Sequence, residues 1–150
     1  LIHHLKYKGK QQIGVFIGKW FGQVLLDSNQ FKDIDYIIPV PLHKKRLKER
    51  GYNQLTTFGK TLSHLLKVEY LDSVLKRVSS SKTQTFKKRL ERFSNIDSRF
   101  IINNLQTLQN KRILLIDDVV TTGATLEACC KELSRVKGIK ISIATIAITQ

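Results

Sequence analysis

The sequence predicts an α/β fold, in which a mostly parallel sheet is covered by helices. Two observations predict it. Short apolar segments rich in β-branched residues alternate with segments in which apolar residues recur every three or four positions. The 150 residues are 41% hydrophobic, enough for one sizeable core, and contain no internal repeat or low-complexity tract. We therefore expect a single domain over residues 1–150. Because the chain begins with Leu and contains no Met, we also expect it to be the C-terminal part of a longer protein.

The first two thirds of the chain predict two helices and two short strands. Apolar residues at helical spacing mark both helices, although Gly14, Gly18 and Gly22 weaken the first. We include Trp20 and Val24 in the packed apolar stripe of that first helix. The helices are expected over residues 11–27 and 55–66, and the strands over 35–40 and 74–78; a short apolar segment follows at 99–102.

The last third predicts a strand, a loop, a helix and a terminal strand. These cover residues 112–117, 118–123, 124–136 and the β-branched run "GIKISIATIAIT". Cys129 and Cys130 are adjacent in the predicted helix, so they suit neither a framework disulfide with each other nor a zinc site by themselves. We interpret them as small helix residues in a reducing compartment.

The net charge of the chain indicates which classes of partner it can attract. A net charge of +14 creates a positive field that attracts nucleic acid, anionic membrane surfaces or phosphorylated small molecules. No apolar run approaches the roughly 18 residues of a membrane span, and the start of the chain lacks a secretory signal pattern. We expect a cytoplasmic protein without membrane insertion.

The segment "ILLIDDVVTTGAT", residues 113–125, predicts a ligand site. In open α/β sheets, ligands bind beyond the carboxyl ends of strands, where the next helix presents unpaired backbone N–H groups. Gly123 allows close approach of a phosphate, and neighbouring threonines add hydroxyl donors. Asp117 and Asp118 would repel a phosphate placed directly on them, but they can accept hydrogen bonds from sugar hydroxyls or face a metal-bound group. A sugar phosphate meets both demands.

Two other interpretations of this segment were considered. Aliphatic residues followed by two aspartates also resemble the Walker B strand of a P-loop ATPase, but the chain contains no G-x-x-x-x-G-K-[ST] motif. Alternatively, Asp118 caps the next helix and Thr-Thr-Gly is an ordinary turn. We favour the ligand site because the thirteen-residue string is much more specific than a bare Asp-Asp pair.

The same string resembles the signature of type I phosphoribosyltransferases, which is four hydrophobic residues, two acids and a Thr/Ser-Thr-Gly loop. In addition, "IPVPLHKKRLKERGYNQL", residues 38–55, resembles the Pro-x-Pro-Leu segment of the ComF family, the competence-protein branch of this fold. The opening "HHLKYKG" is similar to the start of that family's domain after its Cys-rich ribbon. Gln84, Arg92 and Asn95 reproduce the family's spacing, whereas Lys87 stands where the family more often has Leu.

The resemblance implies a parallel core sheet with a small hood and a site for 5-phosphoribosyl-1-pyrophosphate (PRPP) with Mg²⁺. Asp117 and Asp118 would be the catalytic residues and hold the ribose, with Mg²⁺ bound through PRPP rather than directly by the protein. Zinc is expected only in a segment that precedes this chain. The implied 5-phosphate site is Val119, Val120, Thr121, Thr122, Gly123, Ala124 and Thr125; the pyrophosphate site is Pro41, Leu42, His43, Lys44, Arg46 and Arg50; the other motif residues are Gly51, Asn53, Gln54, Gln84, Arg92 and Asn95.

Several functions fit these features. The resemblance implies a PRPP-binding protein that acts in bacterial natural transformation, with single-stranded DNA and a helicase-like competence protein as partners. The alternatives are an active phosphoribosyltransferase with an unknown nitrogen acceptor, or a single-stranded DNA-binding module without catalysis. The basic segment after the first strand fits a pyrophosphate site and a solvated basic face equally well. The residues expected to contact DNA are Lys44, Lys45, Arg46, Lys87, Lys88 and Arg89.

Overall fold

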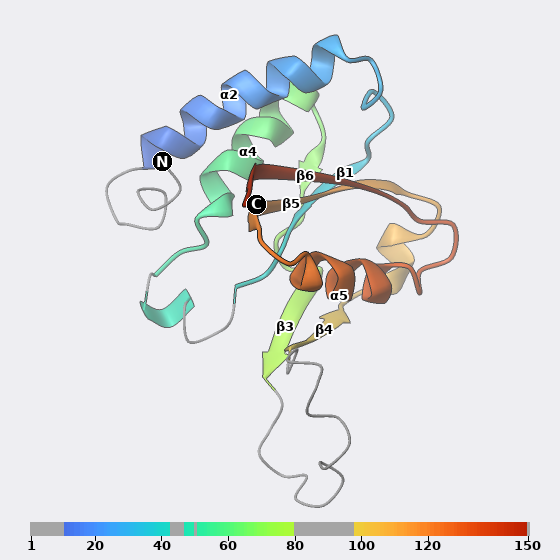
Figure 1. The fold of residues 1–150 in the computed structure, drawn as a ribbon. Coiled ribbons are helices and arrows are strands. Elements are labelled where there is room, and N and C mark those ends of the chain that lie inside the picture. The colour runs from blue at the N-terminus through green and yellow to red at the C-terminus, as the bar shows by residue number, and fades with distance from the viewer. Residues whose placement is uncertain (1–10, 43–46, 50, 80–97, 150) are drawn as a thin grey trace, which may run out of the picture.

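The computed structural model describes residues 11–42, 47–49, 51–79 and 98–149, and its centre is a four-stranded parallel sheet. The strands lie in the order β2-β1-β5-β6, and each neighbouring pair is parallel. Two helices cover one face of the sheet and a third covers the other (Figure 1). The predicted α/β class is therefore confirmed. The strands are β2 (Glu69–Tyr70), β1 (Tyr36–Pro39), β5 (Arg112–Val120) and β6 (Lys140–Ile148); the helices are α2 (Gln11–Asp27) and α4 (Leu55–Leu66) on one face and α5 (Ala124–Leu133) on the other.

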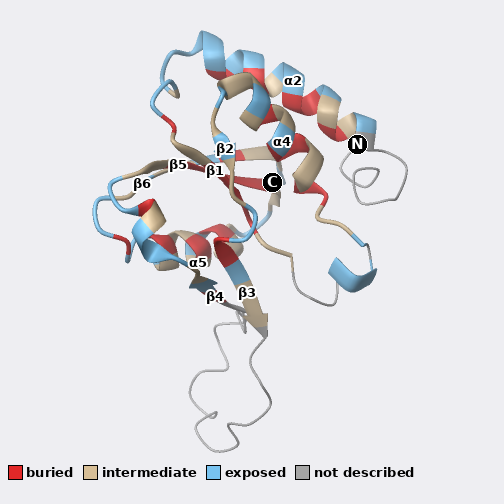
Figure 2. Cartoon of the chain, turned by 180° about the vertical axis from the view of Figure 1, so that it is seen from behind, coloured by how far each residue is buried: buried red, intermediate tan, exposed pale blue. Residues whose placement is uncertain are grey.

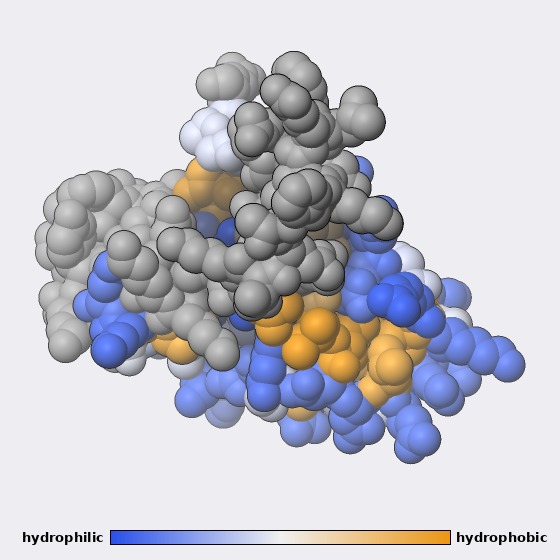
Figure 3. Space-filling model, turned by 90° about the horizontal axis from the view of Figure 1, so that it is seen from below, coloured by the Kyte–Doolittle hydropathy of each residue, from blue (hydrophilic) through white to orange (hydrophobic). Residues whose placement is uncertain are grey.

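A second, two-stranded sheet lies beside α5. Its strands β3 (Leu75–Ser79) and β4 (Ser98–Ile102) pair antiparallel, so that Arg77 faces Phe100. A short 3₁₀ helix, Leu105–Leu108, then leads into β5. The face with α5 and these strands carries an apolar area bordered by hydrophilic side chains (Figure 3). The strand β3 was predicted and β4 covers the apolar segment noted at 99–102, whereas the sequence did not indicate the two-residue strand β2 or the 3₁₀ helix.

The core lies on both faces of the two central strands. Ile113–Ile116 of β5 and Ile37 and Ile38 of β1 are completely buried. Phe58 of α4 is also completely buried and packs on Phe21 of α2, with 5.9 Å between ring centroids. Figure 2 shows the buried residues gathered where the helices face the sheet. Central strands of a parallel sheet are covered on both faces, so their sequences are continuous apolar runs. This is why β1 and β5 could be predicted from the sequence.

The three glycines of α2 form its contact with α4. A Cβ atom at Gly18 would lie 2.7 Å from Cβ of Thr61, and one at Gly22 would lie 2.6 Å from Cδ1 of Leu65. Because a real side chain cannot approach so closely, the glycines allow the two helices to pack with their backbones near each other. The glycines lower the helix propensity of this segment, but the packing of α2 on α4 requires them.

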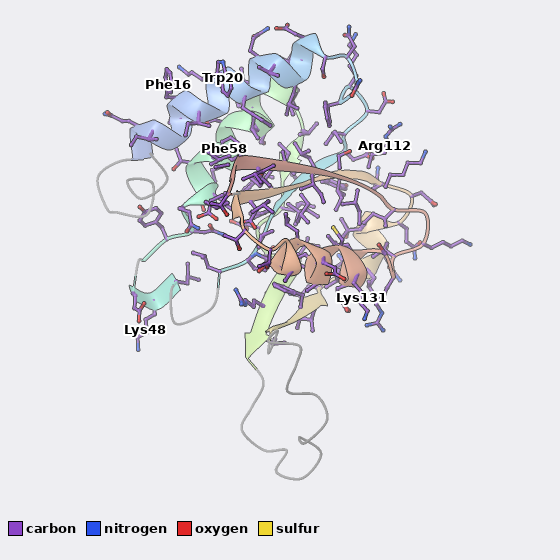
Figure 4. All side chains as sticks on the ribbon, viewed as in Figure 1. Phe16, Trp20, Lys48, Phe58, Arg112 and Lys131 are labelled. Atoms are coloured by element: carbon purple, nitrogen blue, oxygen red, sulfur yellow. The ribbon has the colours of Figure 1, made fainter. Side chains whose placement is uncertain are left out.

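This contact face corrects the predicted orientation of α2. Trp20 and Val24 were expected to pack, but they are 63% and 47% exposed, and Phe16 is 73% exposed. Phe16 and Trp20 point away from α4 (Figure 4). The physical reason is that the glycine stripe, rather than the aromatic one, faces α4, while Ile17 and Leu25 supply the buried apolar contacts.

Two predicted boundaries also differ from the structure. The strand expected to end at residue 117 continues to Val120, because β6 runs beside it and pairs Asp117 with Thr145 and Val120 with Ile148. The helix expected to reach residue 136 ends at Leu133. Its last predicted residues form tighter turns, in which the Val136 N–H donates to the carbonyl of Leu133. No helix in the described part of the chain is long and apolar enough to cross a membrane.

Asp35 joins the start of β1 to the start of β5. Its Oδ2 accepts a hydrogen bond from the Arg112 backbone N–H at 2.8 Å, and its Oδ1 pairs with Nζ of Lys111 at 3.1 Å. The backbone bond from Arg112 is the main cause that lowers the pKa of Asp35 below its ordinary 3.8, with Lys111 adding to it. The carboxylate form therefore stabilises the fold.

Replacing Asp35 with Ala is expected to lower the free energy of unfolding by about 1 kcal/mol at neutral pH, the usual size for one such hydrogen bond. Because the folded pKa is lowered, this contribution is complete above pH 3.8 and is lost as the pH falls below that value. Urea unfolding at pH 7 and at pH 3 measures it. Asp33→Ala is the control, since Asp33 forms only an exposed pair with Arg112. An equal loss in both variants, or no dependence on pH, would contradict this role.

Candidate ligand-binding site

The two aspartates stand where the neighbouring strand ends. The last residue of β1 is Pro39, which pairs with Ile116, so Asp117 and Asp118 continue β5 beyond β1. On the other side, β6 still accompanies them. Asp117 is only 9% exposed, and Asp118 is half-buried. Both acids therefore lie within β5, where Asp117 was predicted, whereas Asp118 was predicted in the loop. They lie at the carboxyl edge of β1, where parallel sheets bind ligands.

Gln54 at the start of α4 holds Asp118. Its Nε2 donates a 2.8 Å hydrogen bond to Oδ2 of Asp118, and Gln54 is only 6% exposed. The other carboxylate oxygen, Oδ1, accepts from the Val119 N–H at 2.9 Å, and Oδ1 of Asp117 accepts from the Asp118 N–H at 2.8 Å. Both acids are thus oriented by hydrogen bonds from the chain itself.

Asn53 connects the loop after β1 to the same helix end. Its Oδ1 accepts a hydrogen bond from the Leu55 N–H at 3.0 Å, and its Nδ2 donates to the carbonyl of Val40 at 3.4 Å. Gly51, two residues earlier, has a φ of 75°, a left-handed conformation that favours glycine. These residues, predicted only as family-motif positions, bring the end of β1, the start of α4 and Asp118 together.

The turn after β5 is shaped to admit a small anion. Gly123 has a φ of 77°, and a Cβ atom there would meet nothing within 4 Å. Gly123 precedes α5 and has no side chain to cap it, and the Ala124 N–H at this helix end donates a long 3.4 Å hydrogen bond to Oγ1 of Thr122. A hollow of about 40 Å³ lies here, lined by Asp117 and residues 119–126. Val119 and Val120 line it as strand residues rather than as loop residues.

Cys129 of α5 lies close enough to Asp117 to respond to its charge. Burial, with the negative charge of Asp117 as the second cause, raises the pKa of Cys129 to about 12. Arg77 of β3 acts on the same thiol in the opposite direction, so its guanidinium also lies in this neighbourhood. Burial likewise raises the pKa of Cys130. Both thiols are free and protonated at neutral pH, which agrees with their interpretation as packing residues.

The remaining predicted residues divide into two groups. Pro41 and Leu42 are half-buried and follow directly from β1, so they stand at the same edge as the acids. Lys48 belongs to the same basic segment and was also expected to reach the ligand; it lies exposed on a short helical turn set apart from the sheet (Figure 4). Outside the described residues lie His43, Lys44, Lys45, Arg46 and Arg50 of the first basic segment, and Gln84, Lys87, Lys88, Arg89, Arg92 and Asn95 of the second.

Sequence reasoning missed two relations at this site. It named Gln54 as a motif residue without a role, and it did not place Arg77 near the acids. Gln54 and Asp118 are 64 positions apart, and no local pattern joins them.

Within the described part of the chain, no group of three His, Cys, Asp or Glu side chains is arranged to hold a metal ion.

Replacing Gln54 with Ala is expected to weaken the binding of an anionic sugar ligand about tenfold, because one hydrogen bond to a charged group, worth about 1.5 kcal/mol, no longer orients Asp118. Ser63→Ala is the control, since it removes the 2.6 Å hydrogen bond to the Val68 carbonyl at the far end of α4. Calorimetric titration with PRPP and Mg²⁺ measures both. Equal affinities of the two variants would show that Gln54 does not position the acid.

Comparison with known proteins places this site in a family. The phosphoribosyl transferase domain model matches residues 55–149, which include α4, both aspartates and the turn after them. The chain is 35% identical to Competence protein F of Haemophilus influenzae over 109 residues, 72% of this chain and 48% of that protein. It is 28% identical to DNA utilization protein YhgH of Escherichia coli (strain K12) over 138 residues, 90% of this chain and 60% of that protein. The chain thus spans about half the length of the curated relatives it matches.

Solved structures share the fold at lower identity. An adenine phosphoribosyltransferase superposes with a TM-score of 0.58 at 17% identity, over 98% of this chain and 74% of that chain. A purine phosphoribosyltransferase from Pyrococcus horikoshii Ot3 superposes with a TM-score of 0.55 at 20% identity, over 91% of this chain and 72% of that chain. This chain belongs to the phosphoribosyl transferase domain family and, within it, is of the ComF type.

Proposed function

We propose that this chain binds PRPP with Mg²⁺ at the turn between β5 and α5, and that it does so as part of a ComF-type protein that handles single-stranded DNA in natural transformation. One observation supports the ligand most directly: two preoriented carboxylates in β5 are followed, at the turn into α5, by a helix start with open space over Gly123. A phosphate and a sugar need these two environments side by side.

The turn supplies the phosphate end of the site. The first N–H groups of α5 and the positive end of its dipole favour an anion at Gly123, and Thr122 and Thr125 add hydroxyl donors. The openness above Gly123 is the observation that makes the fit possible, because a side chain there would occupy the space for the phosphate. The 5-phosphate of PRPP is the group expected in this position.

The acids supply the sugar end. Asp117 and Asp118 would accept hydrogen bonds from the ribose hydroxyls, and the segment after Leu42 would face the pyrophosphate, since β1 and β5 are neighbours and end at the same edge. Mg²⁺ would be held mainly through PRPP oxygens beside these two carboxylates, and it would neutralise charge on the pyrophosphate.

Catalysis of phosphoribosyl transfer is the second candidate, and the fixed orientation of both acids favours it. In that reaction a nitrogen nucleophile bonds to C1 of the ribose while the C1–oxygen bond to pyrophosphate breaks. Positive charge develops on the sugar, and preoriented carboxylates at its hydroxyls stabilise that charge without further reorganisation. The acceptor is not specified by any described residue.

The DNA role is supported by the relatives and by charge. The related proteins are named for competence and for DNA utilization. A net charge of +14 favours a polyanionic partner. The residues proposed for DNA contact, Lys44–Arg46 and Lys87–Arg89, lie outside the described ranges. A helicase-like partner is part of the same proposal.

Two assays separate these possibilities. The first titrates PRPP with Mg²⁺ calorimetrically, with pyrophosphate as the control ligand, and then measures pyrophosphate release with a panel of bases and amines. Saturable binding that pyrophosphate does not reproduce supports the PRPP site, and release that depends on an acceptor identifies an enzyme. The second measures affinity for single-stranded DNA against salt, where a steep fall supports phosphate contacts. Absence of PRPP binding would overturn the proposed ligand, and absence of DNA binding the proposed role.

A further inference from the structure

A separate pocket lies between α2 and α4. Its volume is about 510 Å³, within the range of roughly 300–1,000 Å³ that holds small organic ligands. Val15 and Lys19 of α2 form one wall, and residues of α4 together with Tyr52 form the other. None of its lining residues belongs to the hollow at the β5–α5 turn, so this is a second, distinct site.

The pocket is positively charged because it contains two lysines, one on each wall. Lys19 stands on one wall, and Lys60 and His64 stand one helical turn apart on the other. Among the described residues that line the pocket there is no aspartate or glutamate. Among the described residues, no ion pair joins Lys19, Lys60 or His64 to a carboxylate. Two walls that carry cations favour a ligand with more than one negative charge.

The rest of the lining is suited to a flat, partly apolar group. Val15 and Leu65 supply apolar surface, Tyr52 supplies an aromatic side chain, and threonines of α4 supply hydroxyls. The pocket is also preformed, because the close contact of Gly18 with Thr61 fixes the two helices that build it. A rigid pocket needs little ordering when a ligand enters.

We propose that this pocket binds a free nucleoside diphosphate. The diphosphate would lie between Lys19 on one wall and Lys60 and His64 on the other, and the base would lie against Val15, Leu65 and Tyr52. Because α4 also begins with Gln54, which holds Asp118, the ligand would bind the same helix that supports the acid pair. The proposal concerns a different site from the PRPP site and does not depend on it.

The test is calorimetric titration with ADP of the chain and of two matched double variants. Lys19→Gln/Lys60→Gln removes two cations from the pocket. Lys131→Gln/Lys137→Gln removes two exposed lysines from α5 and the turn after it, on the other face of the sheet (Figure 4). Since each lost charge-assisted contact weakens binding several-fold, we expect at least about tenfold weaker ADP binding in the pocket variant and less than about twofold in the control.

Two further measurements identify the location and the ligand. Val15→Trp keeps every charge but fills the pocket, and it is also expected to weaken ADP binding at least about tenfold. PRPP affinity is expected to stay within about twofold in the pocket variant, apart from the general effect of charge seen in the lysine control. Thermal unfolding of each variant confirms that it is folded.

Several outcomes would overturn the proposal. They are no ADP binding to the unaltered chain, an equal loss in the pocket and control variants, or ADP binding that only Asp117→Asn/Asp118→Asn removes, which would place ADP at the first site. If the pocket variant loses affinity for a single-stranded oligonucleotide but not for ADP, the pocket binds a DNA strand and the proposal is wrong. Inorganic phosphate that binds as tightly as ADP would also contradict a role for the base.

Discussion

The Asp117→Asn/Asp118→Asn variant is expected to bind PRPP with Mg²⁺ at least about 100-fold more weakly than the unaltered chain, because two charge-assisted hydrogen-bond acceptors are lost at once. Asparagine preserves the size of both side chains, so the strand and its packing should persist. Calorimetric titration at fixed ionic strength measures the change. The direction of the change in PRPP affinity distinguishes two explanations. Removing two negative charges from a chain of net charge +14 strengthens its general attraction of anions, so non-specific binding would become tighter rather than weaker.

A matched control separates the site from the overall field. Asp27→Asn/Asp33→Asn also removes two negative charges, from exposed positions at the end of α2 and before β1, away from the carboxyl edge of the sheet. This control should bind PRPP as tightly as the unaltered chain or slightly more tightly. If the Asp117/Asp118 variant behaves like the control, PRPP is attracted by the basic surface in general and the acid pair does not hold the ribose.

The Gly18→Val variant is expected to lower the free energy of unfolding by about 2 kcal/mol, which is typical of overpacking at a closely packed position. A Cβ atom at residue 18 would lie 2.7 Å from Cβ of Thr61 and 3.2 Å from the carbonyl oxygen of Phe58, so α2 and α4 would have to separate. Valine is a slightly better helix former than glycine, and this small gain opposes the expected loss. Chemical denaturation followed by circular dichroism measures the net effect.

The control for this variant is Gln12→Val, which places the same β-branched side chain at an exposed position of α2. It should change stability by less than about 0.5 kcal/mol. Equal stability of Gly18→Val and Gln12→Val would mean that α2 and α4 do not pack through the glycine face. It would also remove the rigid contact on which the preformed pocket between them depends.

The sequence predicted the main elements because their patterns are local. The continuous apolar run of Ile113–Ile116 indicates a buried strand wherever it is read, and the stripe of Phe58 and Leu62 indicates a packed helix. The length of β5, by contrast, is not set by a local pattern. It depends on pairing with β6, more than twenty positions later, and so its extension from Asp117 to Val120 could not be read from the segment itself.

The orientation of α2 failed for a related reason. Apolar side chains usually face the core, so Trp20 was assigned to the packed face, but a glycine stripe can bring helices closer than a large side chain allows. That the glycine face packs on α4 becomes clear only from the α4 residues it contacts, which are Thr57, Thr61 and Leu65. Similarly, the two-residue strand β2 is too short to carry a periodic signal.

The candidate site was predictable in its parts but not in its assembly. The order of strand, acids and Thr-Thr-Gly turn is written along one segment, and the structure places Asp117 and Gly123 around the same hollow. The link from Gln54 to Asp118 exists only in the folded chain. So does the pocket that includes His64, because its lining residues come from two different helices.

The most direct test of the central claim is a two-dimensional ¹H–¹⁵N NMR titration of the chain with PRPP and Mg²⁺. If the turn between β5 and α5 holds the 5-phosphate, the largest amide shifts will occur at residues 121–125, and Asp117→Asn/Asp118→Asn will abolish them. If PRPP binds but the amides of Thr122, Gly123 and Thr125 do not shift, the ligand lies elsewhere and the proposed site is wrong.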